Sequence, residues 1–545
     1  MWKKHPKALP FLFFSEMWER FGYYLMIGIF TLYLEDATKG FNMSTKESAS
    51  LYGTFIALVF FTPFLGGLLA DRVLGYRKSI ILGGLLMGAG YCLMGIHNLN
   101  MLYLAMTLVI LGNGFFKPNI STLLGNVYST PEHMHQKDEG YNIFYMGINV
   151  GAFICNFFGA AMQNIFGWAG AFALAGVGMF IGVIVFITGI RHYASFDVRK
   201  PLQPGDMPLW KIVALVILPS VIFGFIGWKL NGDGYIFDSN STDAFIFACI
   251  PVCIFYTVLL VRSNKQERPA MAAMLAIFAV VILFWAIFKQ NGSALNTWAN
   301  KYTERHVSGF TEQALSSLKL TKSVKYKQDS VVKTDALFRK IKIDGKETKE
   351  WGYPEYFKNI HPEDKPAEGQ ETKVWAPNLS QSINPFWVIA LTPLVVAFFT
   401  WLRRKGKEPS TPTKIAFGLL ISALSVLVMI AAVKAGHNGA EKVSVWWLIG
   451  SYGVITIGEL FLSPMGLSLV SKLSPPRITA LMMGGWFVST SIGNKLSGIL
   501  ASKWDEYDNK VNYFWLNFIL LGAAALFLFI LLKWLNRVMK EKGVN

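Results

Sequence analysis

The chain has 545 residues, of which 53% are hydrophobic and 16% are charged, and its mean hydropathy is +0.39. Soluble globular proteins carry about 25% charged residues, so this composition excludes an ordinary water-soluble protein and indicates a surface that mostly faces lipid. The formal net charge of +17 comes mostly from basic residues between apolar runs, which indicates orientation in a membrane and not nucleic-acid binding.

Apolar runs long enough to cross a membrane follow one another along the chain. A spanning helix needs about 20 mostly apolar residues, and about fourteen runs meet this length. The first run contains charged residues that a signal peptide would lack, so it is predicted to be a true span. The predicted spans are 10–34, 50–70, 79–97, 101–125, 142–164, 168–190, 210–229, 243–262, 270–300, 385–402, 413–433, 445–468, 480–501 and 512–534.

The order of these runs predicts an all-α polytopic membrane protein with the major facilitator fold, in which the substrate site lies at mid-membrane between two six-helix halves. The polar stretch 303–383 interrupts the second half, and its aromatic residues favour a small folded insertion over a flexible linker. The predicted division is an N-terminal bundle at 1–192, a linker with two extra helices at 193–266, the first helix of the C-terminal bundle at 267–302, an extracytoplasmic insertion at 303–383, and the remainder of the C-terminal bundle at 384–545.

The basic residues of the short loops predict the orientation. Cytoplasmic loops are enriched in Lys and Arg, whereas the loop 231–242, on the predicted outer side, contains neither. We therefore predict a multi-pass protein of the cell (inner) membrane with both termini in the cytoplasm. The basic segments assigned to the cytoplasmic side are 71–78, 191–200, 261–268, 402–407, 471–477 and the tail 533–542.

The first span carries a charged stripe. Steps of three and four residues place its charged and phenolic side chains on one helix face. Facing lipid would be very costly for these groups, so they are expected to face a polar cavity or other protein, and an ion-pair network that locks helices together is the structural alternative. The stripe consists of Glu16, Glu19, Arg20, Tyr23 and Ile27.

Two further charged residues lie deep in predicted spans. Lys117 lies near the middle of the fourth span and needs an anionic partner, for which Glu16 or Glu19 is the expected choice. Separation of such a pair inside an apolar site favours protonation of the carboxylate, which is the property that a proton-coupled transporter requires. Glu459 is a lone carboxylate in a later span, where it suits an ammonium ligand better than a purely structural role.

Several segments together resemble one family. The first span reads EMWERFGYY (16–24), which resembles the ExxERFxYY motif of the proton-dependent oligopeptide transporter family. The pair of spans at 210–262 resembles the two additional helices of bacterial members. The other matching segments are GGLLADRVLG (66–75), GNGFFKPNIS (112–121), YNIFYMGINVGAF (141–153), GELFLSPMGLSLVSKLSP (458–475) and GGWFVSTSIGN (484–494).

The resemblance implies a symporter that imports di- and tripeptides with protons by alternating access. It implies that Glu459 binds the peptide amino terminus and that Asn149 contacts the peptide backbone. The proton-coupling residues that it implies are Glu16, Glu19, Arg20 and Lys117. The substrate-binding residues are predicted to be Tyr23, Tyr24, Lys117, Asn149, Trp285, Lys289, Asn384, Glu459 and Trp486.

Two positions depart from the family pattern. Typical members have an Arg where this chain has Ile27, and a Glu where it has Lys289 in FWAIFKQNGS. Our hypothesis is a relocated charge, in which Lys289 supplies the cation that is lost at Ile27. Lys117 and Lys289 would then provide two cations for a peptide carboxylate. The same departures leave room for altered gating and for a substrate that is more anionic than a plain dipeptide.

Other readings stay open. The same fold could move an amino acid, nitrate or a modified peptide, and a membrane receptor or scaffold that acts through the insertion is a second alternative. We expect no enzyme, because the chain has no nucleophile elbow, P-loop or zinc-protease helix. We also expect no cofactor besides the proton, no metal, no nucleic acid, and a functional monomer in lipid. The remaining candidates for metal or disulfide sites are given structural roles. Cys92, Cys155, Cys249 and Cys253 are assigned to packing, and His133 and His135 to a solvated loop.

Overall fold

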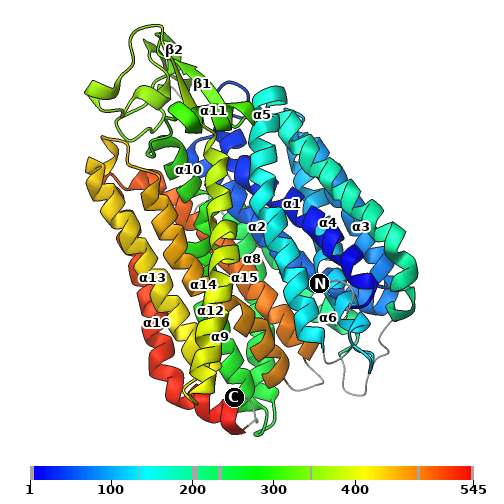
Figure 1. Cartoon of the computed structure of the whole chain (residues 1–545). Helices are drawn as coiled ribbons and strands as arrows, with labels where there is room; N and C mark the ends of the chain where they lie inside the picture. Colours follow the sequence, from blue (N-terminus) through cyan, green and yellow to red (C-terminus); the bar gives the residue numbers. More distant parts are fainter. Residues whose placement is uncertain are drawn as a thin grey trace.

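The computed structural model describes residues 5–133, 136–198, 207–230, 236–237, 239–343, 346–474 and 479–541. A bundle of long helices forms the body, a small, partly β-sheet insertion covers one end, and the C-terminus lies near the opposite end (Figure 1). This confirms the predicted all-α polytopic architecture. His135 and parts of the predicted loops 191–200, 231–242 and 471–477 lie outside the described residues.

The first half is built from five labelled helices, which contain six predicted spans. In α5, Gly167 has φ 71° and ψ −165° and joins two helices that point in different directions. Glycine adopts this positive φ without the steric penalty of a Cβ, so the predicted spans 142–164 and 168–190 lie on either side of it. The helices are α1 (Ala8–Glu35), α2 (Thr45–Leu69), α3 (Tyr76–Met94), α4 (Leu99–Val127) and α5 (Lys137–Gly189).

The remaining helices form the extra pair and the second half. The predicted span 270–300 is interrupted by the 3₁₀ turn Lys289–Gly292, which replaces the expected continuous helix. The extra pair consists of α6 (Leu209–Ile212), the π-helical turn Val213–Ile217, α7 (Leu218–Lys229) and α8 (Asn240–Arg262). The second half consists of α9 (Arg268–Phe288), α10 (Ala294–Lys301), α12 (Ile383–Arg404), α13 (Thr411–Ala435), α14 (Trp446–Leu473), α15 (Thr479–Ser502) and α16 (Lys510–Glu541).

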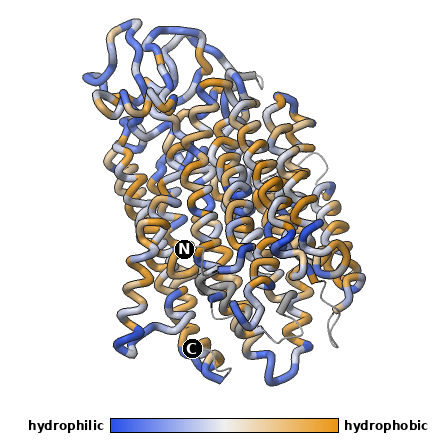
Figure 2. The backbone as a smooth tube through the Cα atoms, turned by 45° about the vertical axis from the view of Figure 1, so that its right-hand side comes forward, coloured by the Kyte–Doolittle hydropathy of each residue, from blue (hydrophilic) through white to orange (hydrophobic). Residues whose placement is uncertain are grey.

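Hydropathy separates the bundle from its ends. Within the described ranges, nine helices are long and apolar enough to cross a membrane. Helix α1 is not one of them, because its charged and aromatic residues lower its hydropathy. Apolar residues dominate the middle of the bundle, and hydrophilic residues gather at its two ends and on the insertion (Figure 2). The chain is therefore organised as a multi-pass membrane protein.

Each half has its own apolar core, and the halves meet along α2 and α15. One core is built by residues between Ala8 and Tyr193, and the other mainly by α9 to α16. A Cβ added to Gly53 would lie 2.6 Å from the Cα of Gly498, so the two helices touch backbone to backbone. Ser491 Oγ also donates to the Ala57 carbonyl at 2.6 Å. Small residues at this contact allow the two halves to pack closely.

The insertion is a folded unit with three short antiparallel strand pairs. Its longest pair joins β1 (Thr321–Lys325) to β6 (Glu371–Trp375), with Thr321 opposite Trp375. Tyr356, Phe357, Ile360 and Val374 form a small core beneath it. The other elements are α11 (Gly309–Ser317), β2 (Asp329–Val332), β3 (Lys342–Ile343), β4 (Lys346–Glu347) and β5 (Lys349–Gly352).

Two adjacent residues of the insertion contact both halves. Arg339 Nη1 donates to Asp508 Oδ1 at 2.8 Å and to the Asp505 carbonyl at 3.0 Å, in the connection between α15 and α16. Lys340 Nζ donates to the carbonyls of Asn42 at 3.1 Å and Met43 at 3.3 Å, in the connection between α1 and α2. The insertion therefore bridges the two halves at the end that it covers.

Candidate functional site

The charged stripe of α1 pairs within itself. Glu16, Glu19 and Arg20 are 2%, 0% and 3% exposed. Arg20 Nη2 donates to Glu19 Oε1 at 2.6 Å, and its Nε contacts the other Glu19 oxygen and lies 3.4 Å from Glu16 Oε1. The Tyr23 ring lies 4.9 Å from the guanidinium. One cation thus serves two buried carboxylates, which leaves one surplus negative charge.

The two carboxylates are not equally satisfied. Glu19 receives two contacts from Arg20, and Asn113 Nδ2 donates to Glu19 Oε1 at 3.5 Å. Among the described residues, Glu16 Oε2 is buried and has no hydrogen-bond partner. An unpartnered buried carboxylate oxygen is costly, and a proton would remove most of that cost. Glu16 is therefore the better placed of the two to accept a proton.

Lys117 does not form the predicted pair. Its ammonium lies 3.9 Å from the centre of the Phe60 ring on α2. Within the described part of the chain it makes no hydrogen bond or ion pair with Glu16 or Glu19. The physical reason is that Arg20, on the same helix as both carboxylates, already occupies them at shorter distances. The charges of Lys117 and of the α1 carboxylates still interact at longer range.

Lys289 occupies the break between α9 and α10. The following residue, Gln290, anchors this turn, because Tyr513 Oη donates to Gln290 Oε1 at 2.7 Å and Gln290 Nε2 donates to Asn517 Oδ1 at 3.1 Å. Lys289 itself is 6% exposed. Broken helices at mid-membrane are a common place for transporter binding sites, because they direct polar groups inward.

The two lysines come from different halves and meet at one aromatic ring. The Lys289 ammonium lies 5.3 Å from the Phe60 ring centre and 5.3 Å from that of Trp285. The structure therefore brings Lys117 and Lys289 together, as the relocated-charge hypothesis requires. Ile27 is only 3% exposed and packs in the core of the first half. Phe60 was not identified from the sequence, because nothing in the pattern of α2 marks a ring that contacts two helices.

The side-chain amide of Asn384 orients Glu459, the buried carboxylate of the second half. Asn384 Nδ2, on α12, donates to Glu459 Oε2, on α14, at 3.0 Å and to Thr456 Oγ1 at 2.9 Å. Glu459 is 9% exposed. Its charge interacts with that of Lys289, and the charge of Lys289 interacts with that of Lys117. A negative group and two positive groups therefore lie within electrostatic range of one another.

Three predicted aromatic residues lie beside these charges. The rings of Tyr23 and Tyr24 are 5.3 Å apart, and Tyr23 lies against Arg20. Trp285 packs next to Lys289, and its Nε1 is buried without a hydrogen-bond partner among the described residues. The hydroxyl of Tyr23 is also buried and unpartnered there. These polar atoms are available to a bound polar molecule.

Two other predicted residues are differently placed. Asn149 Nδ2 donates to the Tyr145 carbonyl of its own helix at 3.0 Å, so its amide is engaged. Trp486 is 4% exposed and packs on Phe278 of α9, with ring centres 6.1 Å apart, in the core of the second half. Within the described residues, Trp486 is therefore placed in the apolar core and not assigned to the charged site.

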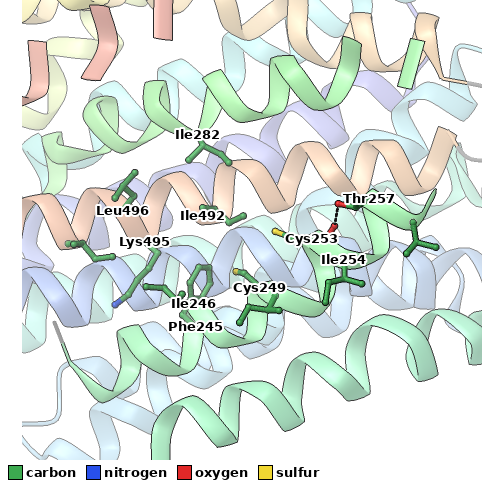
Figure 3. Close-up of a pocket in the computed structure, with 13 residues that line it drawn as sticks. Phe245, Ile246, Cys249, Cys253, Ile254, Thr257, Ile282, Ile492, Lys495 and Leu496 are labelled. Carbon is green, nitrogen blue, oxygen red and sulfur yellow. Dashed lines mark hydrogen bonds between the residues drawn. The ribbon is translucent and has the colours of Figure 1, made fainter. Parts of the chain in front are cut away.

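An apolar hollow of about 660 Å³ lies elsewhere, between α8, α9 and α15 (Figure 3). Its walls include Phe245, Cys249, Cys253, Ile282 and Ile492. Lys495 borders it, but its Nζ donates to Thr54 Oγ1 at 2.7 Å. This hollow offers little polar surface, so we do not assign it to a charged substrate. Among the described residues, no group of three or more His, Cys, Asp or Glu side chains could hold a metal.

The geometry favours a ligand with opposite charges at its two ends. Glu459 and Asn384 present an acceptor for an ammonium group, and Lys117 and Lys289 present donors for an anion. The α1 stripe adds a carboxylate with a free oxygen for a proton. The charged groups are mostly buried, so the site is largely closed to solvent in this structure.

Comparisons with known proteins identify the family. The family model described as POT family matches residues 77–316 and 374–516. The chain is 27% identical to dipeptide and tripeptide permease A of Escherichia coli (strain K12), over 93% of this chain and 86% of the relative. It is 26% identical to peptide transporter YePEPT of Yersinia enterocolitica subsp. palearctica serotype O:3 (strain YE-P4), over 98% of this chain and 96% of the relative.

Solved structures show the same fold. A peptide transporter of the POT family in complex with sulfate superimposes with a TM-score of 0.75 and 27% identity, covering 99% of this chain and 96% of that chain. A POT family transporter in complex with 5-aminolevulinic acid gives a TM-score of 0.75 and 25% identity, covering 99% and 98%. These matches confirm the predicted family resemblance and the major facilitator fold.

Proposed function

The chain belongs to the POT family, and from this premise we propose that it is a proton-coupled symporter that imports di- and tripeptides by alternating access. It is a multi-pass membrane protein. We place it in the cell (inner) membrane, with both termini in the cytoplasm and the insertion outside. We take the functional unit to be a monomer, because each chain carries both halves of the site.

The placement of opposite charges is the observation that carries this proposal. A peptide at neutral pH has an ammonium group at one end and a carboxylate at the other. Glu459, held by Asn384, fits the ammonium end, and Lys117 and Lys289 fit the carboxylate end. Because Lys117 belongs to the first half and Glu459 to the second, a bound peptide would bridge the halves that must move in alternating access.

Proton coupling is assigned to the α1 stripe. Protonation of Glu16 would remove its attraction to Arg20, which then keeps Glu19 as its sole carboxylate partner within the stripe. Protonation removes the surplus negative charge of the stripe. The electrostatic attraction between the stripe and the Lys117 ammonium then becomes weaker. Proton binding to Glu16 and binding of the peptide carboxylate both change the electrostatic environment of Lys117. Transport of the proton is thereby coupled to transport of the peptide.

Uptake into liposomes tests the proposal. Purified protein is reconstituted, and uptake of labelled dialanine is measured with and without an inward-acid pH gradient. Uptake that rises with the gradient, and that unlabelled di- and tripeptides compete, supports the proposal. A folded protein that takes up no dialanine under either condition overturns the cargo assignment and leaves the fold unaffected.

The second candidate is a transporter of the same fold that moves a different solute, such as an amino acid, nitrate or a modified peptide. The observation that favours it is that Lys117 and Lys289 have no ion pair within the described residues, so they would accept anions other than a peptide carboxylate. One solved relative is in complex with 5-aminolevulinic acid. Competition of dialanine uptake by amino acids and by nitrate distinguishes the two candidates, because a peptide-selective site would be inhibited by neither.

A further inference from the structure

Among the described residues, the two lysines at Phe60 have no anionic partner at ion-pair distance, and the charge of Glu459 reaches Lys289 only at longer range. Lys289 is 6% exposed and Lys117 is partly buried. Among the residues that the structure describes, neither ammonium makes a hydrogen bond or an ion pair, and both have the Phe60 ring as a neighbour. Buried charges in proteins are normally paired, because desolvation without a partner is costly. A bound anion would therefore give these two lysines the close-range partners that they lack.

The carboxylates of the site do not supply the missing partners. Glu16 and Glu19 share Arg20, and Glu459 is held by the amide of Asn384. The aromatic ring compensates only in part, because a cation–π contact is worth about 0.5–2 kcal/mol. Lys289 also lies 5.3 Å from the Trp285 ring centre and 5.8 Å from that of Phe288, but aromatic rings carry no net charge and do not replace an ion pair.

A single carboxylate does not match the two ammonium groups beside the Phe60 ring. The α-carboxylate of a peptide carries one negative charge, whereas two ammonium groups lie within 5.3 Å of the same ring centre. A second carboxylate a few bonds away would pair with the second lysine. The short aliphatic linker between the two carboxylates would then lie on the Phe60 ring, which is itself only 8% exposed.

We propose that Lys117, Lys289 and Phe60 form a dianion site, which selects peptides whose carboxyl-terminal residue has an acidic side chain. The α-carboxylate binds one lysine, and the side-chain carboxylate of Asp or Glu binds the other. The ammonium end of the same peptide binds Glu459. This inference rests on the proposed peptide transport, because it names the peptide class that the same site prefers.

Neutral analogues of the same shape test the preference. Inhibition of labelled dialanine uptake is compared for Ala-Glu against Ala-Gln and for Ala-Asp against Ala-Asn, in buffer without sulfate or phosphate. We expect each acidic peptide to inhibit at a concentration at least about tenfold lower than its amide partner, as for a charge-assisted hydrogen bond. Equal inhibition by the acidic and amide peptides overturns the dianion site, while peptide transport itself would stand.

A matched pair of variants locates the effect. Lys289→Met should bring the ratio between Ala-Glu and Ala-Gln close to one, because the second cation is gone and the apolar volume is kept. Lys414→Met serves as the control. Lys414, on α13, is also 6% exposed, but its Nζ pairs with Glu408 Oε1 at 2.7 Å. The control should keep the ratio of the unmodified protein. An unchanged ratio in Lys289→Met overturns the assignment.

Binding to the purified protein separates this inference from the transport assay. Thermal stabilisation in detergent is measured with Ala-Glu and with Ala-Gln, since a ligand that binds the folded state raises the unfolding temperature. Stronger stabilisation by Ala-Glu supports the dianion site even if dialanine uptake is absent and peptide transport fails. Equal stabilisation by the two peptides, or none by either, contradicts it.

Discussion

Two charged regions lie inside this bundle, and they are built in opposite ways. The α1 stripe gathers Glu16, Glu19 and Arg20 from one helix and pairs them with each other. The Phe60 region gathers Lys117 and Lys289 from two halves and leaves both without an ion pair among the described residues. The first region has its close-range ion pairs without a ligand, whereas the lysines of the second region have none within the described residues. In the function proposed above, the paired region serves stability and proton binding, and the two lysines serve the ligand.

The largest effect is expected when the shared cation of the first region is removed. Arg20→Met leaves two buried carboxylates without their partner, and a broken buried pair costs about 3–5 kcal/mol. We expect a large fall in the unfolding temperature in detergent and loss of gradient-driven uptake. Glu16→Gln is the milder comparison, because it removes only the contact at 3.4 Å. An Arg20→Met protein as stable as the original would show that the stripe is not held by this pairing.

The same kind of substitution in the second region should act on binding and not on folding. Lys289→Met removes a buried charge that has no ion pair, so we expect an unchanged or higher unfolding temperature. Peptide affinity should fall about tenfold or more, which corresponds to the loss of a charge-assisted hydrogen bond. Competition against labelled dialanine measures the affinity. A variant that loses stability but keeps its affinity would reverse the contrast between the two regions.

The negative end of the site sharpens the comparison. Glu459→Gln keeps a carbonyl oxygen for the Asn384 amide, so the local structure should persist while the charge is lost. We expect peptides with a free amino terminus to bind about tenfold more weakly. N-acetylated peptides have no ammonium group, so their affinity should not fall. An equal loss of affinity for free and for N-acetylated peptides would show that Glu459 does not bind the peptide amino terminus.

The smallest effect concerns a second aromatic ring with two cations, at the insertion. Arg305 and Lys442 lie 5.3 and 4.7 Å from the Tyr356 ring, but here Lys442 Nζ also donates to the Lys301 carbonyl at 2.9 Å. Burial, with the charge of Arg305 as a further cause, lowers the pKa of Lys442 to about 7.

This lowered pKa predicts a pH dependence of stability. An unfolded Lys keeps its proton up to a pKa of about 10.4, so between about pH 7 and pH 10 the unfolded chain binds more protons than the folded one. The contribution of Lys442 to the free energy of unfolding should therefore rise with pH through this window. The unfolding temperature of the original protein is compared with that of Lys442→Met across these pH values. An identical slope for both would exclude Lys442 as the cause.

Periodicity and motifs anticipated much of the fold and part of the site. The apolar runs predicted the spans, and steps of three and four residues placed the α1 stripe on one face. The motif segments pointed to Asn384 and Glu459, which the structure joins by a hydrogen bond.

What the sequence could not show depends on how separate helices pack. The missing contact between Lys117 and the α1 carboxylates follows from competition by Arg20, and the shared ring of Phe60 follows from the approach of α2, α4 and the turn after α9. The sequence predicts continuous helix across Lys289–Gly292, because the apolar flanks hide the Gln290 network that anchors the break.

The contacts of Arg339 and Lys340 set a geometric limit on the end of the molecule that the insertion covers. Consecutive Cα atoms are about 3.8 Å apart, yet these two side chains reach the α15–α16 connection and the α1–α2 connection, respectively. While both sets of contacts persist, the two connections cannot lie farther apart than the two side chains, one Cα–Cα step and the two hydrogen bonds reach. Any state in which that end widens must first release one set of contacts, so a crosslink from residue 340 to residue 42 would make the Arg339 contacts the set that has to break.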